Sequence, residues 1–322
     1  MLPAAPSSGY TPVDPSAIAL TPRSRALLAA SATAPPFAST PLAAQRAARE
    51  SAALQAGRGA TPVREVFDVP ASEAGVPLRV YEPPGGAGAP SPLLLFLHGG
   101  GWALGSVRTH DELCRQLCAA SRCGVVSVDY RLSPEAPYPL PLDDCAAGYS
   151  WAAVRAGGAG VVLCGDSAGG NLAAALALRL RDEGAAPAPL AQVLVYPAVD
   201  AACAAASYSR FSGGFALTLE KMRVYWGLYA GGADAGSPYV SPLLAPSLAG
   251  LPPALVVLAD ADVLRDEGAA YAAALARAGG RADVLVFEGV LHGFIADAEN
   301  EVAADAVRAI AEWLRGAGIV KG

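Results

Sequence analysis

Residues 160–178 read Gly160-Val-Val-Leu-Cys-Gly-Asp-Ser-Ala-Gly-Gly-Asn-Leu-Ala-Ala-Ala-Leu-Ala-Leu178 and pass from a strand pattern to a helix pattern across one short turn. The first part is apolar throughout, as expected of a strand covered on both faces. The turn, Gly165-Asp-Ser-Ala-Gly169, fits the pattern G-x-S-x-G, in which a serine stands on a sharp strand-to-helix bend. A chance match is not rare in a chain with 35 glycines. The flanking strand and helix, however, supply the context that this bend requires.

Ser167 is therefore the candidate nucleophile. A sharp bend forces the serine into a strained backbone conformation, which only small neighbours allow. Gly165, Gly169 and Gly170 supply that room. The serine hydroxyl should then stand at the carboxyl end of the sheet, where the N-terminus of the next helix directs its partial positive charge at the reacting centre.

Elsewhere the chain alternates between strand and helix. We predict strands at 63–69, 76–81, 93–97, 124–129, 160–164, 190–196, 254–259 and 282–287, and helices at 41–55, 109–120, 142–155, 167–182, 217–229, 266–278 and 301–314. Thr109 and Glu112 have the spacing of a capping box at the start of one helix. Repeated strand and helix units require parallel pairing and right-handed crossovers. The predicted fold is α/β, with a mostly parallel central sheet covered by helices on both faces.

Three successive glycines follow the buried strand 93–97, in His98-Gly-Gly-Gly-Trp102. A run of this kind is either a flexible loop or an oxyanion hole, because backbone without Cβ atoms can bring its N–H groups close to a carbonyl oxygen that gains charge. The candidate donors are Gly99, Gly100 and Gly101, together with Ala168 from the serine turn. We favour Gly100 and Gly101 of the three, and we expect His98 to hold the loop.

A serine needs a general base, and the base needs a carboxylate that orients it. The chain has three histidines, and only His292 follows the serine, as the order nucleophile, acid, histidine requires. The acid should follow the strand 254–259. Asp260 and Asp262 both fit, and spacing alone does not choose between them; Asp266 is more simply a helix first-turn carboxylate.

Five motifs together resemble the hormone-sensitive-lipase-like carboxylesterases, bacterial family IV: His98-Gly-Gly-Gly-Trp102, Asp129-Tyr-Arg-Leu-Ser-Pro-Glu135, Gly165-Asp-Ser-Ala-Gly-Gly-Asn-Leu-Ala173, Asp262-Val-Leu-Arg-Asp-Glu-Gly268 and His292-Gly-Phe294. The resemblance covers about residues 60–322. It implies an α/β-hydrolase fold with a helical cap, and it selects Asp262 as the acid. The implied division is a first cap segment at 1–57, a first core part at 58–200, a cap insertion at 201–236 and a second core part at 237–322.

The resemblance also implies a serine carboxylesterase that acts without a cofactor on short- to medium-chain acyl esters. Cap and loop residues would line the substrate pocket, namely Trp102, Phe215, Leu217, Met222 and Trp226. Two alternatives stay open. An amidase or deacetylase would use the same three catalytic groups, and a ligand-binding receptor on a hydrolase scaffold would lack the histidine.

The amino-acid composition excludes some classes of binding partner. Twenty-three basic and 29 acidic residues give a net charge of −6, without a basic run, which argues against nucleic acid and anionic membranes as partners. Prolines interrupt the first residues, so we expect no secretory signal and a cytoplasmic location; a homodimer is left open.

His110, Cys114 and Cys118 share one helix face, which we interpret as buried packing and not as a metal site. The six cysteines are expected to be free, partly buried thiols.

Overall fold

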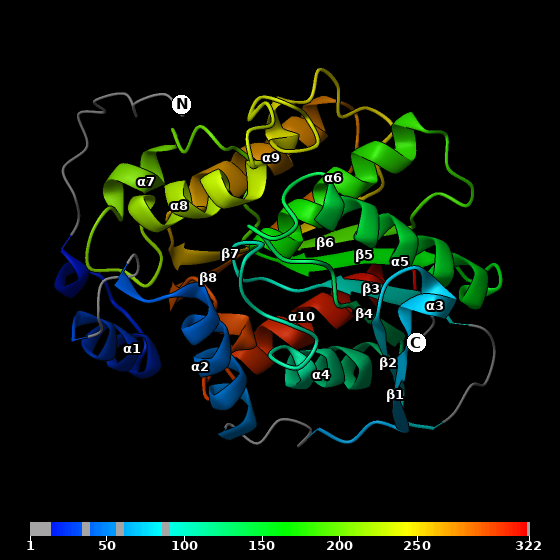
Figure 1. Ribbon diagram of the computed structural model, residues 1–322, viewed down its shortest axis with the longest axis horizontal. Helices are drawn as coiled ribbons and strands as arrows, with labels where there is room; N and C mark the ends of the chain where they lie inside the picture. The colour runs from blue at the N-terminus through cyan, green and yellow to red at the C-terminus, as the bar shows by residue number, and fades with distance from the viewer. Residues whose placement is uncertain (1–13, 34–38, 56–60, 86–90, 321–322) are drawn as a thin grey trace.

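The computed structural model describes residues 14–33, 39–55, 61–85 and 91–320 and contains one eight-stranded sheet (Figure 1). The strand order is β1-β2-β4-β3-β5-β6-β7-β8. β1 and β2 pair antiparallel with each other, β2 pairs antiparallel with β4, and every later pair is parallel. The strand bounds are Glu65–Val69, Leu78–Glu82, Leu93–Leu97, Gly124–Val128, Val161–Asp166, Ala191–Val195, Ala254–Ala261 and Ala282–Leu291 for β1 to β8.

Helices cover both faces of this sheet, as Figure 1 shows. The longer ones are α4 (Asp111–Ser121), α5 (Leu140–Ala156), α6 (Ala168–Asp182), α9 (Arg265–Arg277) and α10 (Ala303–Gly316). Side chains of β3 alternate between two buried clusters: Leu95 and Leu97 belong to the one with α5, α6 and α9, whereas Leu94 and Phe96 belong to the one with α4 and α10. A strand buried on both faces explains the unbroken apolar run of β3, and the predicted α/β fold is confirmed.

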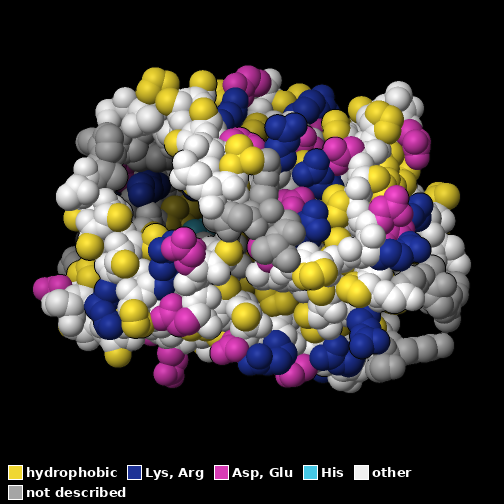
Figure 2. Space-filling model, turned by 90° about the horizontal axis from the view of Figure 1, so that it is seen from below, with side chains coloured by type: hydrophobic (Ala, Val, Ile, Leu, Met, Phe, Trp, Pro, Cys, Tyr) yellow, Lys and Arg dark blue, Asp and Glu magenta, His cyan; other side chains and the backbone are white. Residues whose placement is uncertain are grey.

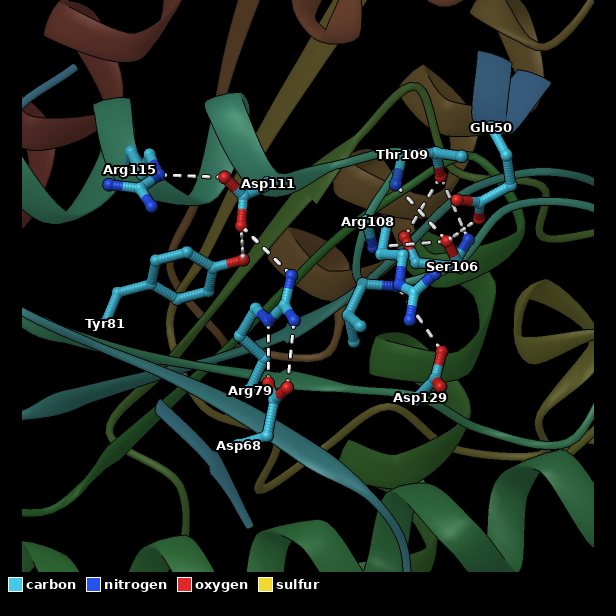
Figure 3. A network of polar contacts seen from close by, with 11 residues as sticks. Glu50, Asp68, Arg79, Tyr81, Ser106, Arg108, Thr109, Asp111, Arg115 and Asp129 are labelled. Atoms are coloured by element: carbon cyan, nitrogen blue, oxygen red, sulfur yellow. Dashed lines mark hydrogen bonds and ion pairs between the residues drawn. The ribbon is translucent and has the colours of Figure 1, made fainter. Parts of the chain in front are cut away.

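The start of α4 differs from the prediction, because no side chain caps it. Thr109 Oγ1 bonds within the turn to the backbone of Ser106, and the Glu112 carboxylate bonds to Thr61. The prediction of a capping box at this helix is therefore wrong. Asp111 instead connects the helix to the sheet, since its carboxylate accepts hydrogen bonds from the Tyr81 hydroxyl and from Arg115, and contacts Arg79 (Figure 3).

The segments before the sheet form α1 (Pro22–Ala32) and α2 (Leu42–Gln55), and only the second of these helices was predicted. In Figure 1 they lie on the same side of the molecule as α7 (Ala206–Arg210) and α8 (Leu219–Ala230). The short helix α3 (Ala71–Ala74) lies between β1 and β2. Of the predicted first cap segment, residues 1–13, 34–38 and 56–57 fall outside the described residues.

Polar contacts attach α1 and α2 to the rest of the molecule. Arg46 of α2 donates to the carbonyl oxygens of Ala103 and Ser133 at 2.8 and 2.9 Å and forms a two-point ion pair with Glu135. Arg23 of α1 pairs with Asp297 at 2.6 Å. Both helices are therefore fixed against loops that follow β3, β4 and β8.

All six cysteines are free and fully buried, not partly buried as expected. Burial raises the pKa of Cys118 to about 12 and that of Cys123 to about 11. These thiols are therefore unreactive packing groups. Within the described part of the chain, no helix combines the length and the apolar character needed to cross a membrane.

Candidate active site

Ser167 stands between the end of β5 and the start of α6, with φ 55° and ψ −117°. Three residues close to it in the chain have no room for a Cβ. A Cβ on Gly165 would lie 2.3 Å from the carbonyl oxygen of Gly169, and one on Gly169 would lie 1.8 Å from the carbonyl oxygen of Leu97. One on Gly170 would lie 2.9 Å from Pro197 Cβ. The three glycines thus provide the space that the sequence pattern predicted. They allow the serine backbone to keep a strained conformation that residues other than glycine seldom adopt.

His292 lies beside Ser167, although 125 residues separate them along the chain. Its Nε2 is 2.8 Å from Ser167 Oγ, and its Nδ1 is 2.7 Å from Asp262 Oδ2. His292 follows β8 directly, and Asp262 follows β7, which pairs with β8. Neighbouring parallel strands that end at one edge of the sheet therefore bring the imidazole and the carboxylate together.

The structure distinguishes the two candidate acids. The Asp262 side chain is fully buried, and its second oxygen accepts the N–H of Leu264 at 3.0 Å. Asp260 instead lies 3.5 Å from Arg265, with about 29% of its side chain exposed. Only Asp262 is placed to orient the imidazole, while Asp260 forms a surface ion pair.

The glycine loop follows β3 and has conformations that favour glycine. Gly100 and Gly101 have φ values of 127° and 62°, and a Cβ on Gly101 would lie 2.2 Å from the Tyr225 ring. Among the described residues, no acceptor binds the N–H groups of Gly100, Gly101 or Ala168. These three N–H groups are therefore available to a ligand.

Gly99 does not belong with these donors, which corrects the predicted set. Its N–H donates to Asp166 Oδ1 at 2.8 Å and is thereby occupied. A Cβ on Gly99 would lie 2.3 Å from the same carboxylate. Gly99 is therefore a glycine because it lies against Asp166, and its N–H fixes the loop to the residue that precedes the serine.

Asp166 and His110 were not predicted to belong to the site. Burial opposes ionisation of Asp166, but His110, 3.4 Å away, and the Gly99 N–H outweigh it and lower the pKa of this carboxyl group. His98 Nδ1 lies 2.9 Å from the carbonyl oxygen of Gly99, and its ring stacks on Tyr130. Burial, assisted by His110, lowers the pKa of His98 to about 3. A neutral His98 can thus donate its Nδ1–H to the loop, as expected of a residue that holds it.

A cavity of about 770 Å³ opens onto Ser167 and His292. Figure 2 shows a hollow on this face with Lys or Arg side chains, apolar side chains and a histidine inside it. Of the predicted substrate-binding residues, Trp102, Leu217 and Met222 line the cavity.

Phe215 and Trp226 are not part of that lining. Phe215 packs on Phe211 with ring centroids 5.1 Å apart, and Trp226 packs on Trp102 at 4.3 Å. Both are buried within the aromatic interior around α8. Helix α8 contributes Tyr225, the residue before Trp226, to the cavity lining instead.

Among the described residues, no three histidine, cysteine or acidic side chains are grouped so that they could hold a metal ion. His110 lies at the N-cap of α4, where it is buried against Asp166, whereas Cys114 and Cys118 face the interior.

The arrangement of hydroxyl, imidazole and buried carboxylate, beside free N–H groups on a mostly parallel sheet, defines the class of serine hydrolases. Residues 94–296 match the model of a family described as having the alpha/beta hydrolase fold. Carboxylic ester hydrolase LipN of Mycobacterium tuberculosis is 42% identical over 240 residues, which are 71% of this chain and 63% of LipN. Ethyl acetate hydrolase of Pseudomonas putida is 36% identical over 264 residues, or 78% of this chain and 82% of that enzyme.

A solved structure agrees with these relatives. The hyperthermophilic esterase of Pyrobaculum calidifontis superimposes with a TM-score of 0.84 at 35% identity, over 94% of this chain and 99% of that one. The chain therefore belongs to the α/β-hydrolase family, among its hormone-sensitive-lipase-like carboxylesterases, as predicted.

Proposed function

We propose that this protein is a serine carboxylesterase that hydrolyses short- to medium-chain acyl esters. The observation that carries the proposal is the continuous contact from Ser167 through His292 to Asp262, at 2.8 and 2.7 Å. The names of the relatives, which include carboxylic ester hydrolase and ethyl acetate hydrolase, support the same reaction. The substrate is thus a small ester.

Each residue of the contact has one role. Ser167 Oγ attacks the ester carbonyl carbon while His292 Nε2 takes its proton. Asp262 holds the proton on His292 Nδ1 and stabilises the imidazolium that forms. His292 then gives the proton to the departing alkoxide, which leaves as the alcohol. Water repeats the attack on the acyl-serine ester and releases the acid.

The N–H groups of Gly100, Gly101 and Ala168 stabilise the negative oxygen of each tetrahedral intermediate. Backbone donors held in place before the reaction need no reorganisation as charge develops, and loss of one donor typically costs a factor of about 10² to 10³ in kcat. Asp166 and His98 position the loop that carries two of these donors.

The cavity supports the proposed substrate range. Leu217 and Met222 give it apolar walls, and a volume of about 770 Å³ accommodates a small ester. We further propose that residues 1–57 and 201–236 form the cap, because α2 and α8 contribute cavity residues that include Arg49 and Tyr225.

The test is turnover of p-nitrophenyl esters of increasing acyl length, beside a p-nitroanilide of the same acyl group. We expect the shorter esters to be hydrolysed faster than the longest ones and than the anilide. Ser167→Ala should lower kcat by about 10⁴-fold or more. Ser150→Ala, an exposed serine on α5, should retain the parent activity. Anilide turnover that exceeds ester turnover would make the protein an amidase, and full activity of Ser167→Ala would refute the mechanism.

A further inference from the structure

The cavity next to the catalytic groups is lined by two positively charged side chains, Arg49 and Lys221, that form no ion pair among the described residues. Besides Asp166 and the histidines His110 and His292, its ionisable lining residues are Arg23, Arg49, Lys221, Glu112, Asp297 and Glu299. Each of the three acids has hydrogen-bond or ion-pair partners of its own, although those of Glu112 are uncharged. Asp297 and Glu299 both pair with Arg23, and Glu112 accepts hydrogen bonds from Thr61 and Gln116.

Arg49 and Lys221 remain. Among the described residues, neither forms an ion pair with a carboxylate. Glu50, next to Arg49 on α2, reaches the Ser106 hydroxyl in the turn before α4 (Figure 3). Glu220, next to Lys221, is exposed and outside the cavity lining. The segments that the structure does not describe contain no aspartate or glutamate in their sequence, so they supply no acidic side chain as a partner for either cation.

The two cations come from different helices that line the cavity, and they act on one another. Arg49 belongs to α2 and Lys221 to the first turn of α8. Burial, with the positive charge of Arg49 as the next cause, lowers the pKa of Lys221. Two like charges that face one half-enclosed space repel each other, and an anion between them removes that cost.

The side chains of Arg49 and Lys221 both have N–H groups that can donate further hydrogen bonds. Lys221 Nζ donates to the carbonyl oxygen of Ala216 at 2.8 Å and keeps two further N–H donors. The Arg49 guanidinium has five N–H donors in a planar fork that matches a carboxylate. A carboxylate between the two groups would receive a two-point contact from one side and a point charge from the other.

We propose that Arg49 and Lys221 form an anion-binding subsite of the active-site cavity, and that the preferred substrate is an ester that carries a carboxylate. This inference rests on the proposed esterase function and specifies its substrate class. Leu217, Met222 and Tyr225 line the same cavity, so the linker between ester and carboxylate is apolar. The carboxylate sits on either the acyl or the alcohol side of the ester, and the two arms of the test separate these cases.

The first arm compares monoethyl adipate, whose acyl side carries the charge, with the neutral ethyl hexanoate. The second arm compares 4-(butanoyloxy)butanoate, whose alcohol side carries the charge, with butyl butanoate. In each arm the measured quantity is the ratio of kcat/KM for the charged ester to that for the neutral ester, followed by proton release. A ratio removes any general effect of a variant on folding or on the catalytic groups.

Arg49→Gln and Lys221→Gln should each lower this ratio about fivefold in one arm, since each removes one partly solvated ion pair with the substrate. Arg49→Lys and Lys221→Arg should largely restore it. Arg277→Gln, which removes an exposed arginine at the end of α9, is the matched control and should leave the ratio unchanged. Added salt should lower the ratio of the parent and have little effect on the double variant Arg49→Gln, Lys221→Gln.

Ratios that none of the variants changes, in both arms, would overturn the subsite while neutral ester turnover still upheld the esterase. A parent enzyme that hydrolyses none of the four esters would overturn both proposals. A ratio that Arg277→Gln lowers as much as Arg49→Gln does would assign the effect to the net charge of the protein and would also overturn the subsite.

Discussion

Replacing Asp262 by asparagine should nearly abolish turnover, and the structure shows how. One oxygen of Asp262 accepts the Leu264 N–H at 3.0 Å, and the other lies 2.7 Å from His292 Nδ1. An asparagine must keep its oxygen toward Leu264 and turn its amide NH₂ toward the imidazole. Nδ1 then has to accept a hydrogen bond, so the ring proton moves to Nε2. An Nε2–H that faces Ser167 cannot remove the serine proton.

The expected loss in kcat is about 10⁴-fold, the size found where a triad aspartate is changed in this way, which corresponds to about 5.4 kcal/mol of activation free energy. Asp260→Asn is the matched control, because Asp260 is a partly exposed partner of Arg265 at 3.5 Å. A pair of this kind contributes about 0–1 kcal/mol to stability and nothing to the proton transfer.

The assay is kcat on p-nitrophenyl butyrate for the parent and both variants, with circular dichroism melting curves to establish that each is folded. We expect Asp262→Asn to be folded and nearly inactive, and Asp260→Asn to stay within a factor of a few of the parent. An Asp262→Asn variant within tenfold of the parent, or a larger loss in Asp260→Asn, would refute this account of the proton path.

Three further predictions concern stability and attachment. Gly169→Ala should lower the free energy of unfolding by about 3 kcal/mol or more, because the new Cβ would lie 1.8 Å from the Leu97 carbonyl oxygen; Gly227→Ala on α8, with no atom within 4 Å of its Cβ, should be neutral or stabilising in the same thermal melts. Arg46→Ala should speed hydrogen exchange and proteolysis of residues 42–55, because α2 loses its hydrogen bonds to two carbonyl oxygens and a carboxylate; unchanged exchange there would contradict this. Burial raises the pKa of Glu267 well above its usual value, so the folded state keeps a proton that the unfolded state loses above a pH of about 4.3. Stability should therefore fall by about 1.4 kcal/mol per pH unit between that pH and the raised pKa, and Glu267→Gln should remove this slope from a plot of melting temperature against pH.

The elements with strong local patterns were predictable, and those fixed by distant contacts were not. The buried strand Leu93–Leu97 and the serine turn are marked by unbroken apolar runs and glycines. Helix α1 is attached through Arg23 to Asp297, 274 residues away, and no local pattern reports such a contact. Its start was still readable, since Thr21 caps the helix and Pro22 follows at the first position.

The strand β8 was predicted too short for a related reason. It continues to Leu291, which pairs with Ala261 beyond an irregularity where β8 has two more residues than β7. The sequence Glu288-Gly-Val-Leu291 contains a glycine with φ 67° and does not alternate as a strand, so only pairing with β7 defines it. This extension matters for function, because it carries the strand directly to His292. The cytoplasmic location and the homodimeric state stay predictions.

The register between β3 and β5 explains why the glycine loop and the serine turn act as one unit. The two strands run parallel, with Leu97 opposite Gly165. The segments that follow the two strands leave the sheet at the same level. The Gly99 N–H therefore reaches Asp166 Oδ1, with 2.8 Å between the nitrogen and the oxygen. A shift of this register by one residue would turn the side chains of β3 to the opposite face and would separate the loop from the serine. The sheet core and the oxyanion donors therefore depend on the same pairing, which is why a local motif, read without its partner strand, identified the loop but assigned Gly99 to the wrong role.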